Sequence, residues 1–508
     1  MLLKLLTFSL LTLLSVRTLY FYQLKEYRFD RLYDFFRFDK GLRTVFSLPF
    51  IISYLVFGLN LVINSSLLFL VGLISLGIHC ALSFNKYGFL RPSLTIKALT
   101  ILILQLFLIL YGLFYLNLSA TITVLLAPLG LFGLVLIYTP VTKLLKELTI
   151  YKAQQKLKKH SNLIIIGITG SYGKSSVKEY LAQVLSFNEK FQVLKTPKNI
   201  NTDIGVAKVI LNSLLPTHRV MIVEMGAYKI GEISNIVKMM PLDFAVITAM
   251  AHQHLSLFGS LENIQTAKSE IAQGLKPDGK LYLNVDSKGV YEILNNFNGS
   301  QVVTYGTSPK ATLQVYNPVE DCTKNQISFS LNQEAFQATT LPMHNAYNLA
   351  PVIDIAIKLG LSLADIKMAL LNLKPSDNSF KLLKTAKYTI VDDSYNSNLE
   401  GFKSAVAFTK SMPAPQKVLI TMGMIELGTL SESMHRDIAS NCDFYDLVIL
   451  TKQELKPYFE PYIKPEKLII VESPDEIIEA LQQKLVDGSL ILVENRLNPK
   501  VFNYLKNS

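Results

Sequence analysis

Long apolar runs dominate the first part of the chain. Four of them approach the roughly 20 residues that cross a bilayer, and none contains a charged side chain. A further run, Leu2–Tyr22, is weaker because Lys4 and Arg17 interrupt it. The pattern predicts a helical, multi-span membrane module of four or five helices over residues 1–142. The four uninterrupted runs are Phe46–Ile63, Ser65–Phe84, Ala98–Leu116 and Ala120–Tyr138.

Basic residues gather in two segments between these runs. Since loops rich in lysine and arginine stay in the cytoplasm, we expect both segments, and the chain after Tyr138, to be cytoplasmic whether or not the first run spans. No small-residue cleavage site follows the first run, so we do not expect a signal peptide. The basic residues are Lys25, Arg28, Arg31, Arg37, Lys40 and Arg43 in the first segment, and Lys86, Arg91 and Lys97 in the second.

A basic amphipathic stretch follows the last apolar run, over residues 143–160 (KLLKELTIYKAQQKLKKH). Such a stretch suits the anionic headgroup surface of a membrane. A solvated linker helix has the same pattern, and the sequence does not separate the two.

From residue 161 the pattern changes to short apolar runs that alternate with helical periodicity. This alternation is typical of α/β domains built on parallel sheets. We expect a central nucleotide-binding α/β domain over residues 161–386 and a Rossmann-like C-terminal α/β domain over 387–508. The predicted strands of the second domain are Tyr388–Asp392, Lys417–Met422, Leu447–Leu450, Leu468–Val471 and Ser489–Val493, and Pro474–Val486 is a predicted helix.

Composition agrees with a membrane protein. Half of the 508 residues are hydrophobic, only 18% are charged and the mean hydropathy is +0.31, which excludes a disordered or purely soluble chain. The three cysteines have no CxxC spacing, so neither a disulfide framework nor a structural zinc site is expected.

The net charge of +11 belongs to the apolar part. Residues 1–160 hold 17 Lys and Arg against 5 Asp and Glu, whereas residues 161–508 hold 33 against 34. The later part has only three arginines and no net positive charge with which to neutralise a phosphate backbone. We therefore expect no nucleic-acid partner.

A glycine loop follows the first predicted strand, Leu163–Ile168, and a helical pattern follows the loop. Glycines let backbone N–H groups surround phosphate oxygens at a helix N-terminus, a lysine reaches the outer phosphates and a serine hydroxyl can bind Mg²⁺. The common spacing would put a glycine at Ile168, so an ordinary turn is the alternative. The loop consists of Thr169, Gly170, Ser171, Tyr172, Gly173, Lys174, Ser175 and Ser176.

This spacing resembles that of the Mur ligase family, the ATP-dependent amide-bond-forming enzymes of peptidoglycan synthesis. Further segments resemble family motifs in order, and the last three point to the branch that adds a terminal D-alanyl-D-alanine dipeptide. They are Val220–Gly226 (VMIVEMG), Ala245–Ser260 (AVITAMAHQHLSLFGS), Thr266–Ile271 (TAKSEI), His344–Asn348 (HNAYN), Asp392–Asn398 (DDSYNSN) and Gly423–Gly428 (GMIELG).

The resemblance implies a reaction in which ATP phosphorylates a carboxylate and an amine then displaces phosphate from the acyl phosphate. It implies ATP and two Mg²⁺ ions as cofactors, with Ser175, Glu224 and His254 as metal ligands. Lys268 would be carbamylated and would hold a metal as an anion. A structural histidine and an exposed lysine are the alternatives at His254 and Lys268, and His252 is expected to be structural.

Other positions are assigned by the resemblance alone. Asn348 would bond to adenine and Asp393 to the ribose, with Asn345 and Asp392 as structural neighbours. A substrate-binding loop and a polar turn are equally compatible with Asn199, Asn201 and Thr202. The candidates for the acceptor side of the cleft, each of which could equally be a surface residue, are His435, Arg436 and Arg496.

The chain departs from the family pattern at two motifs. The segment Leu373–Lys381 lacks an expected arginine, whose charge Lys381 or Lys384 would have to replace, although lysine lacks the planar fork of arginine. The family's G-D-M becomes Gly423-Met424. A non-catalytic, nucleotide-binding scaffold of envelope synthesis therefore stays an alternative.

The membrane module stands where the family has a soluble domain that grips a UDP-sugar. Either it recruits a lipid-linked donor, or it only anchors the enzyme in the cell membrane with its catalytic domains in the cytoplasm. The expected partners are the bilayer, a UDP- or lipid-linked cell-wall precursor peptide, and an amino acid or dipeptide. A polyglutamate-type capsule ligase also combines a membrane segment with a similar ATPase, but explains the HNAYN and DDSYNSN motifs less well.

Overall fold

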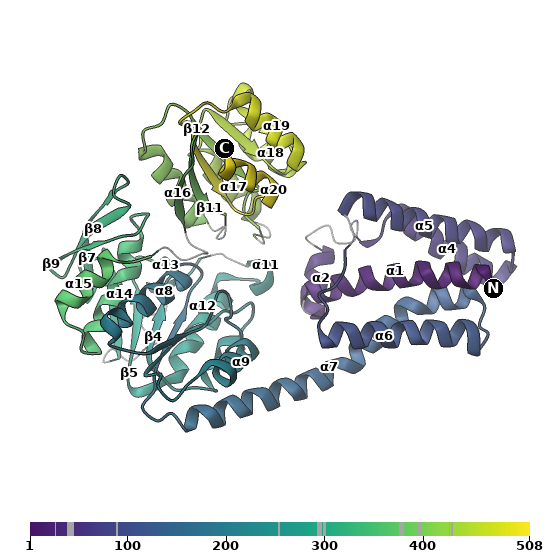
Figure 1. Cartoon of the computed structure of the whole chain (residues 1–508), viewed down its shortest axis with the longest axis horizontal. Coiled ribbons are helices and arrows are strands. Elements are labelled where there is room, and N and C mark those ends of the chain that lie inside the picture. The colour runs from purple at the N-terminus through teal and green to yellow at the C-terminus, as the bar shows by residue number, and fades with distance from the viewer. Residues whose placement is uncertain are drawn as a thin grey trace. The chain divides into compact units, whose positions relative to one another are not determined.

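The computed structural model describes residues 1–25, 27–37, 45–87, 90–251, 255–291, 297, 301–374, 380–394, 399–425, 427 and 430–508. The chain forms two compact units, Met1–Leu148 and Thr149–Ser508. We call them the helical unit and the α/β unit (Figure 1).

Among the residues that the structure describes, four helices are long and apolar enough to cross a membrane, and each lies wholly or partly in the helical unit. The interrupted first run forms a full helix of 23 residues, α1, whereas the predicted span Phe46–Ile63 yields α4 with only 16 residues, about 24 Å of helix. The helices are α1 (Leu2–Leu24), α2 (Phe29–Arg37), α4 (Leu48–Ile63), α5 (Ser66–Tyr87), α6 (Ile96–Leu110), which continues into the π-helical turn η1 (Tyr111–Tyr115), and α7 (Ala120–Lys158).

Polar groups lie inside the helical unit and apolar side chains cover its outside. Asn60 donates from Nδ2 to Thr121 Oγ1 at 2.9 Å, and Gln105 donates to the Ala127 carbonyl at 2.8 Å, both in buried positions. Large aliphatic side chains such as Leu55 and Val62 are exposed. This distribution is the one expected of helices surrounded by lipid.

Helix α7 is 39 residues long and continues from the last apolar run through most of the predicted linker (Figure 1). Its last turns belong to the α/β unit, where Ala153 and Leu157 are buried with Leu163 and Ile165. The apolar face of the basic stretch is therefore covered by protein at these positions.

The central part of the α/β unit is a nine-stranded sheet in the order β2-β3-β1-β4-β5-β6-β7-β8-β9. Its strands pair in parallel from β2 to β7, and the last two join as antiparallel hairpins. Nearly continuous apolar runs form the inner strands because both faces are buried. The strands are β1 (Ile164–Thr169), β2 (Val193–Lys195), β3 (Val220–Glu224), β4 (Leu242–Ile247), β5 (Leu275–Asn284), β6 (Val302–Gly306), β7 (Leu313–Asp321), β8 (Gln326–Leu331) and β9 (Glu334–Ala338).

Helices connect and cover these strands. The apolar side chains around the central sheet form two cores. One of these cores includes α8 and α14 and extends to side chains of the C-terminal sheet, which is described below. The helices are α8 (Lys174–Leu185), α9 (Asp203–Ser213), α10 (Glu232–Val237), α11 (Leu255–Phe258), α12 (Leu261–Ser269), α13 (Lys288–Tyr291), α14 (Asn345–Lys358) and α15 (Leu363–Leu371).

The C-terminal part is a six-stranded sheet in the order β10-β11-β15-β12-β13-β14, parallel except for β10. Each predicted strand is present within two residues of its expected bounds. The strands are β10 (Lys381–Lys384), β11 (Thr389–Asp393), β12 (Lys417–Thr421), β13 (Leu447–Leu450), β14 (Leu468–Ile470) and β15 (Leu490–Glu494); the helices are α16 (Leu399–Ser411), α17 (Ser431–Ala439), α18 (Lys456–Phe459), α19 (Pro474–Lys484) and α20 (Pro499–Asn507).

Candidate nucleotide and metal site

The glycine loop lies between β1 and α8, at the carboxyl end of the central sheet. Gly170 and Gly173 have φ values of +151° and +81°, which side-chain-bearing residues rarely adopt. A Cβ at Gly170 would lie 2.0 Å from Thr248 Oγ1, and one at Gly173 would lie 2.7 Å from Asn348 Oδ1. A side chain at either position would therefore collide with neighbouring atoms, so the loop conformation requires glycine there. The loop ends at the N-terminus of a helix, where anions bind well.

Lys174 folds back over this loop. Its Nζ donates to the carbonyl oxygens of Gly170 at 2.6 Å and Ser171 at 3.1 Å. Burial lowers the pKa of Lys174, and the nearby Glu224 carboxylate opposes that effect. The ammonium thus lies at the loop, where it can meet the outer phosphates of a nucleotide.

The rest of the loop is held by neighbouring strands. Thr169 is buried and donates to the Met225 carbonyl at 2.9 Å, and the backbone N–H of Ser171 donates to the Ala249 carbonyl at 2.6 Å. Burial raises the pKa of Tyr172 to about 12, so this phenol stays neutral. Tyr172 and Ser176 face the cavity described below.

Glu224 ends β3 beside the first turn of α8 and is only 3% exposed. Its Oε2 accepts hydrogen bonds from Ser175 Oγ at 3.0 Å and from Lys178 Nζ at 3.0 Å. The predicted pair Ser175 and Glu224 is therefore brought together. Carboxylate and hydroxyl oxygens beside a phosphate loop are ligands that suit Mg²⁺, which takes few protein ligands.

Sequence reasoning missed Lys178, which is 1% exposed. Besides the ion pair with Glu224, its Nζ donates to the Lys198 carbonyl at 2.7 Å. The sequence could have indicated Lys178, because residues 174 and 178 are four positions apart on a helix and therefore share a face. Lys178 connects the candidate metal ligand Glu224 to the predicted substrate loop.

That loop runs between β2 and α9. Asn199 is exposed, Asn201 accepts at its carbonyl from the Gly226 N–H at 2.9 Å, and Thr202 is the N-cap of α9, where its Oγ1 accepts from the Gly205 N–H at 3.4 Å. The contact between Asn201 and Gly226 places the loop next to the end of β3 that carries Glu224. A substrate role for these three residues stays a prediction.

Lys268 lies on α12 and is 5% exposed. Burial, reinforced by the Lys174 ammonium, lowers the pKa of Lys268 well below its ordinary value. Carbamylation needs a neutral amine to attack carbon dioxide, and this environment favours the neutral form. The structure therefore contradicts the alternative for Lys268, which was an exposed lysine.

Within the described residues, no three His, Cys, Asp or Glu side chains converge on one point. His254 and His252 lie outside the described residues. Ser175 and Glu224 supply oxygen donors that fit a divalent cation, and a carbamylated Lys268 is the predicted addition.

A cavity of about 410 Å³ opens beside the loop, between the central and C-terminal sheets. Asn348 from α14 and Asp393 from β11 both line it, so the two predicted nucleotide contacts face one space. Asn348 is held by a hydrogen bond from its Nδ2 to Asn345 Oδ1 at 3.0 Å. Asn345 in turn donates to the Leu341 carbonyl at 2.8 Å, which agrees with its expected structural role.

The cavity has further polar lining residues that sequence reasoning did not assign, among them Asp286, Lys403 and His344. His344 bonds through Nδ1 to Ser404 Oγ at 2.9 Å and so ties α14 to α16. Burial lowers the pKa of His344 to about 4, so the imidazole is neutral at physiological pH. His344 belongs to the HNAYN motif, and this motif could have identified it as a residue of the site.

Asp393 pairs in register with Glu494 at the carboxyl ends of the adjacent strands β11 and β15. Burial raises the pKa of Asp393 to about 7, and the neighbouring Asp392 adds to that rise while a hydrogen bond with Glu494 opposes it. Burial and the Asp393 charge raise the pKa of Glu494 well above its ordinary value. The pair therefore holds a proton at neutral pH.

The three candidate acceptor residues occupy different environments. His435 is 2% exposed: its Nδ1–H donates to the Ser431 carbonyl at 2.6 Å and its Nε2 accepts from the Met424 N–H at 2.9 Å. Burial lowers its pKa, so the ring is neutral. Arg436 donates to Glu432 at 3.0 Å one helical turn away, and Arg496 is exposed after β15.

Parts of the predicted motifs are outside the described residues, including residues 375–379, 395–398, 426 and 428–429. Of the two lysines considered as replacements for the expected arginine, Lys381 lies opposite Asp392 in the β10–β11 pair, and Lys384 is exposed.

Two sequence profiles match the α/β unit. The Mur ligase middle domain matches residues 168–356, and the Mur ligase glutamate ligase domain matches residues 380–494. Together they account for more than half of the chain.

Curated relatives are named UDP-N-acetylmuramoyl-tripeptide–D-alanyl-D-alanine ligase. The Bacillus subtilis protein is 27% identical over 67% of this chain and 75% of its own length. The Escherichia coli protein is 31% identical over 53% of this chain and 60% of its own length.

Solved structures share the fold. MurF from Acinetobacter baumannii superposes with a TM-score of 0.63 and 22% identity, covering 71% of this chain and 78% of that protein. MurF ligase from Thermotoga maritima, determined in complex with ADP, superposes with a TM-score of 0.62 and 24% identity, covering 71% and 83%.

Proposed function

Since the chain belongs to the Mur ligase family, we propose that it is a membrane-anchored, ATP- and Mg²⁺-dependent ligase of cell-envelope synthesis. It joins the terminal carboxylate of a cell-wall precursor peptide to the amine of a dipeptide, D-alanyl-D-alanine by analogy with the names of its relatives. The precursor is UDP-linked or lipid-linked.

One observation carries this proposal. The loop that begins at Thr169 and the Ser175–Glu224 pair lie at one sheet edge, buried Lys268 is close enough to Lys174 for their charges to interact, and the cavity beside the loop is lined by Asn348 and Asp393. These are the groups needed to hold a triphosphate at one end and a nucleoside at the other.

The chain's own residues supply most of the chemistry. The loop N–H groups and Lys174 bind phosphate oxygens and offset the charge that develops when the carboxylate attacks the outer phosphorus. Ser175 and Glu224 would hold Mg²⁺, which would supply positive charge to offset the charge that develops on the phosphates. The amine then attacks the acyl carbon and phosphate leaves, so no enzyme nucleophile is required.

The apolar helices support membrane anchoring. In the part of the chain that the structure describes, four are long enough to span, and the basic residues that follow α1 and α5 favour cytoplasmic loops at those ends. We infer that the helical unit lies in the cell membrane and that the α/β unit works in the cytoplasm, where ATP is available.

The direct test uses the full chain purified in detergent with ATP, Mg²⁺, D-alanyl-D-alanine and either UDP-linked or lipid-linked muramyl tripeptide. Phosphate release and the mass of the product are measured. Lys174→Ala should reduce turnover by about 100-fold or more, because it removes a cation that meets the transferred phosphate.

The matched control is Lys190→Ala, which removes an exposed lysine just beyond the other end of α8 and should leave turnover unchanged. If no donor gives a product and the envelope phenotype survives Lys174→Ala, the ligase function is wrong and the chain is a non-catalytic scaffold.

A further inference from the structure

Helix α7 carries a row of exposed apolar side chains at a regular spacing. The positions advance by four, three, four and three residues, and each side chain is between 48% and 66% exposed. This 3.5-residue average is the spacing at which two helices pack along each other in a coiled coil. The members of this row, which we call the α7 row, are Ile137, Val141, Leu144, Leu148 and Tyr151.

Most of the α7 row lies beyond the reach of lipid in the proposed orientation. The last apolar run ends at Tyr138, and α7 continues without a break to Lys158. At 1.5 Å per residue, Leu148 lies about 15 Å and Tyr151 about 20 Å past that end, whereas the head-group layer on one side of a bilayer is only about 5 to 8 Å thick. A helix tilt of 40° still leaves Tyr151 about 15 Å away. Lipid therefore covers Ile137 but not the last part of the row.

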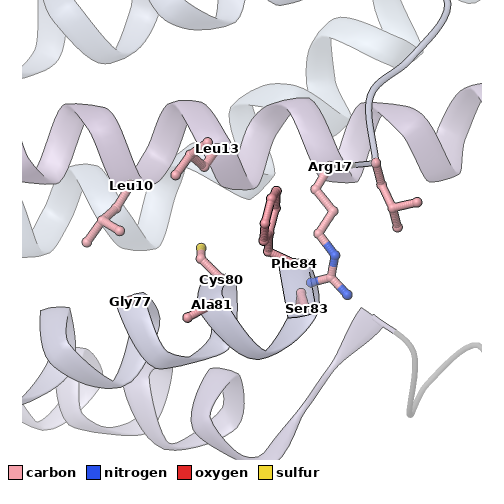
Figure 2. A pocket seen from close by; sticks show the side chains of 9 residues that line it. Leu10, Leu13, Arg17, Gly77, Cys80, Ala81, Ser83 and Phe84 are labelled. Carbon is pink, nitrogen blue, oxygen red and sulfur yellow. The ribbon is translucent and has the colours of Figure 1, made fainter. Parts of the chain in front are cut away.

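The contacts that α7 makes within the chain use another side of the helix. At 3.6 residues per turn, Ala153 and Leu157 are turned by about 160° from the middle of the row, and both are buried in a core of the α/β unit. The cavity of about 340 Å³ that Figure 2 shows is lined by described residues of α1, of α5 and of the segment after α5. The α7 row does not border that cavity.

Opposite charges lie on the two edges of the row. With Val141 taken as position a of a heptad, Glu147 is at position g and Lys152 is at position e, and both are exposed. In a parallel, in-register pair of helices, position g of one helix lies beside position e of the other, five residues further on. Glu147 of each copy would therefore lie beside Lys152 of the other, and the twofold axis would form this ion pair twice.

The membrane supplies the parallel arrangement that this pairing needs. Copies of one chain insert into a bilayer in the same orientation, and confinement to the membrane raises the concentration of one helix near the other. This help is needed because the row covers about two heptads, whereas a coiled coil that forms by itself usually has three or four. A second copy thus brings both the matching apolar row and the complementary charges.

We propose that α7 forms a dimer interface, in which the row from Val141 to Tyr151 packs in parallel against the same row of a second copy of this chain. Two ion pairs between Glu147 and Lys152 flank the seam. The inference rests on the membrane anchoring in the proposed function, which sets the two chains parallel, and it does not depend on the ligase reaction.

Cysteine cross-linking of the full chain in lipid vesicles tests the seam. A disulfide forms only between residues whose Cα atoms come within about 7 Å of each other. Leu148→Cys should therefore give a cross-linked dimer at least about tenfold faster than the matched control Lys143→Cys, an exposed position on another side of α7. The wild type gives the background of the native cysteines. Equal rates at residues 143 and 148 would overturn the interface.

A second set of variants leaves the apolar row intact. Glu147→Lys and Lys152→Glu each place like charges in both ion pairs, and each should lower the dimer fraction about fivefold, whereas the double variant should restore it. Lys143→Glu makes the same charge change outside the seam and should have no effect. Energy transfer between labelled copies, measured as the vesicles are diluted with lipid, gives the dimer fraction. A double variant as weak as the single ones would contradict the pairing.

Other outcomes would identify a different occupant of the row. If Leu148→Cys does not cross-link but is protected from a water-soluble maleimide in vesicles that hold one chain each, lipid covers the row. A cross-linked product in native membranes whose mass is not twice that of the chain would assign the row to a different protein. Either result would replace the dimer.

The dimer and the ligase function fail separately. Cross-linking needs no ATP, so Lys174→Ala should cross-link like the wild type. If the wild type makes no amide product but residue 148 still cross-links selectively, the ligase function is wrong and the dimer stands. If the chain does not float with lipid vesicles, the anchoring is wrong and the dimer loses its basis.

Discussion

Both units of the chain hold a cationic side chain against a neighbouring element, Lys178 buried in one and Arg17 half-buried in the other, but they surround it differently. In the α/β unit, Lys178 forms an ion pair with Glu224 at 3.0 Å, and both side chains are almost fully buried. In the helical unit, Arg17 bonds to the neutral ring of His79. The first arrangement fixes a carboxylate beside the glycine loop, whereas the second holds a half-buried cation between helices α1 and α5.

The difference follows from what each surrounding solvent provides. In the α/β unit, a buried charge needs an opposite charge, because removing one partner leaves the other without compensation in a poorly polarisable interior. In a membrane, ionisable groups near a helix end mark places where anionic head groups or substrates come close. The buried carboxylate of Glu224 thus keeps a charged partner, whereas Arg17 has the imidazole of His79 among its partners.

The largest effect should come from breaking the ion pair of the α/β unit. Lys178→Met leaves the Glu224 carboxylate buried without its cation and should lower the free energy of unfolding by about 3 kcal/mol. It also removes the bond to the Lys198 carbonyl, so KM for the donor should rise. Denaturant unfolding of the full chain in detergent and steady-state kinetics measure the two effects.

Lys190→Met is the matched control because that lysine is exposed. If Lys178→Met unfolds at the same denaturant concentration as Lys190→Met and keeps the wild-type KM, Lys178 does not connect the metal ligand to the loop.

A medium effect should appear in the pH dependence of stability. Asp393 has a pKa of about 7 in the folded chain and an ordinary value of 3.8, so the folded state binds more protons than the unfolded state between these values. Stability should therefore fall as the pH rises from about 4 to about 7 and then level off. Asp393→Asn should flatten this fall and raise stability at pH 8 by an amount on the order of 2 kcal/mol.

The corresponding control is Asp443→Asn, which alters an exposed carboxylate of the same domain. Thermal unfolding between pH 4 and pH 8 separates the two variants. A steeper dependence in Asp393→Asn than in the wild type would show that the pair with Glu494 does not hold the proton.

The smallest effect should come from the polar interior of the helical unit. Asn60→Leu removes the bond to Thr121 and the acceptor of the Ser65 N–H, and the loss of the interhelical bond should lower the stability of the helical unit by about 0.6 kcal/mol, the average for hydrogen bonds between membrane helices. Unfolding in sodium dodecyl sulfate followed by circular dichroism measures it. Ser9→Ala, which removes an exposed hydroxyl bonded within its own helix, should have no effect, and a stabilising Asn60→Leu would contradict the account.

The sequence predicted the two kinds of fold well because their signals are local. Charge-free apolar runs indicated spans, and alternating apolar runs indicated the strands of the C-terminal sheet. Leu2–Tyr22 was rated weak because two basic residues interrupt it. In the structure Lys4 bonds to the Leu113 carbonyl and Arg17 to His79, so partners on other helices accommodate both.

Long-range partners explain what sequence reasoning missed in the site. Ser175 and Glu224 could be paired through recognised motifs, whereas the contact of Lys178 with the Lys198 carbonyl depends on how α8 packs against the loop after β2. Glu494 was not assigned because its place beside Asp393 depends on the register of two strands that are distant in the chain. Periodicity predicts strands but does not specify which ones pair.

The central claim is that the glycine loop, Glu224 and Lys268 converge on the phosphates of a nucleotide. An experimental structure of the full chain with Mg²⁺ and a non-hydrolysable ATP analogue tests it most directly. We predict metal density bound by Ser175 and Glu224, extra density for a carbamate on Lys268 Nζ, and the adenosine in the cavity lined by Asn348 and Asp393. Phosphates bound elsewhere, with Glu224 and Lys268 directed away from them, would contradict the account.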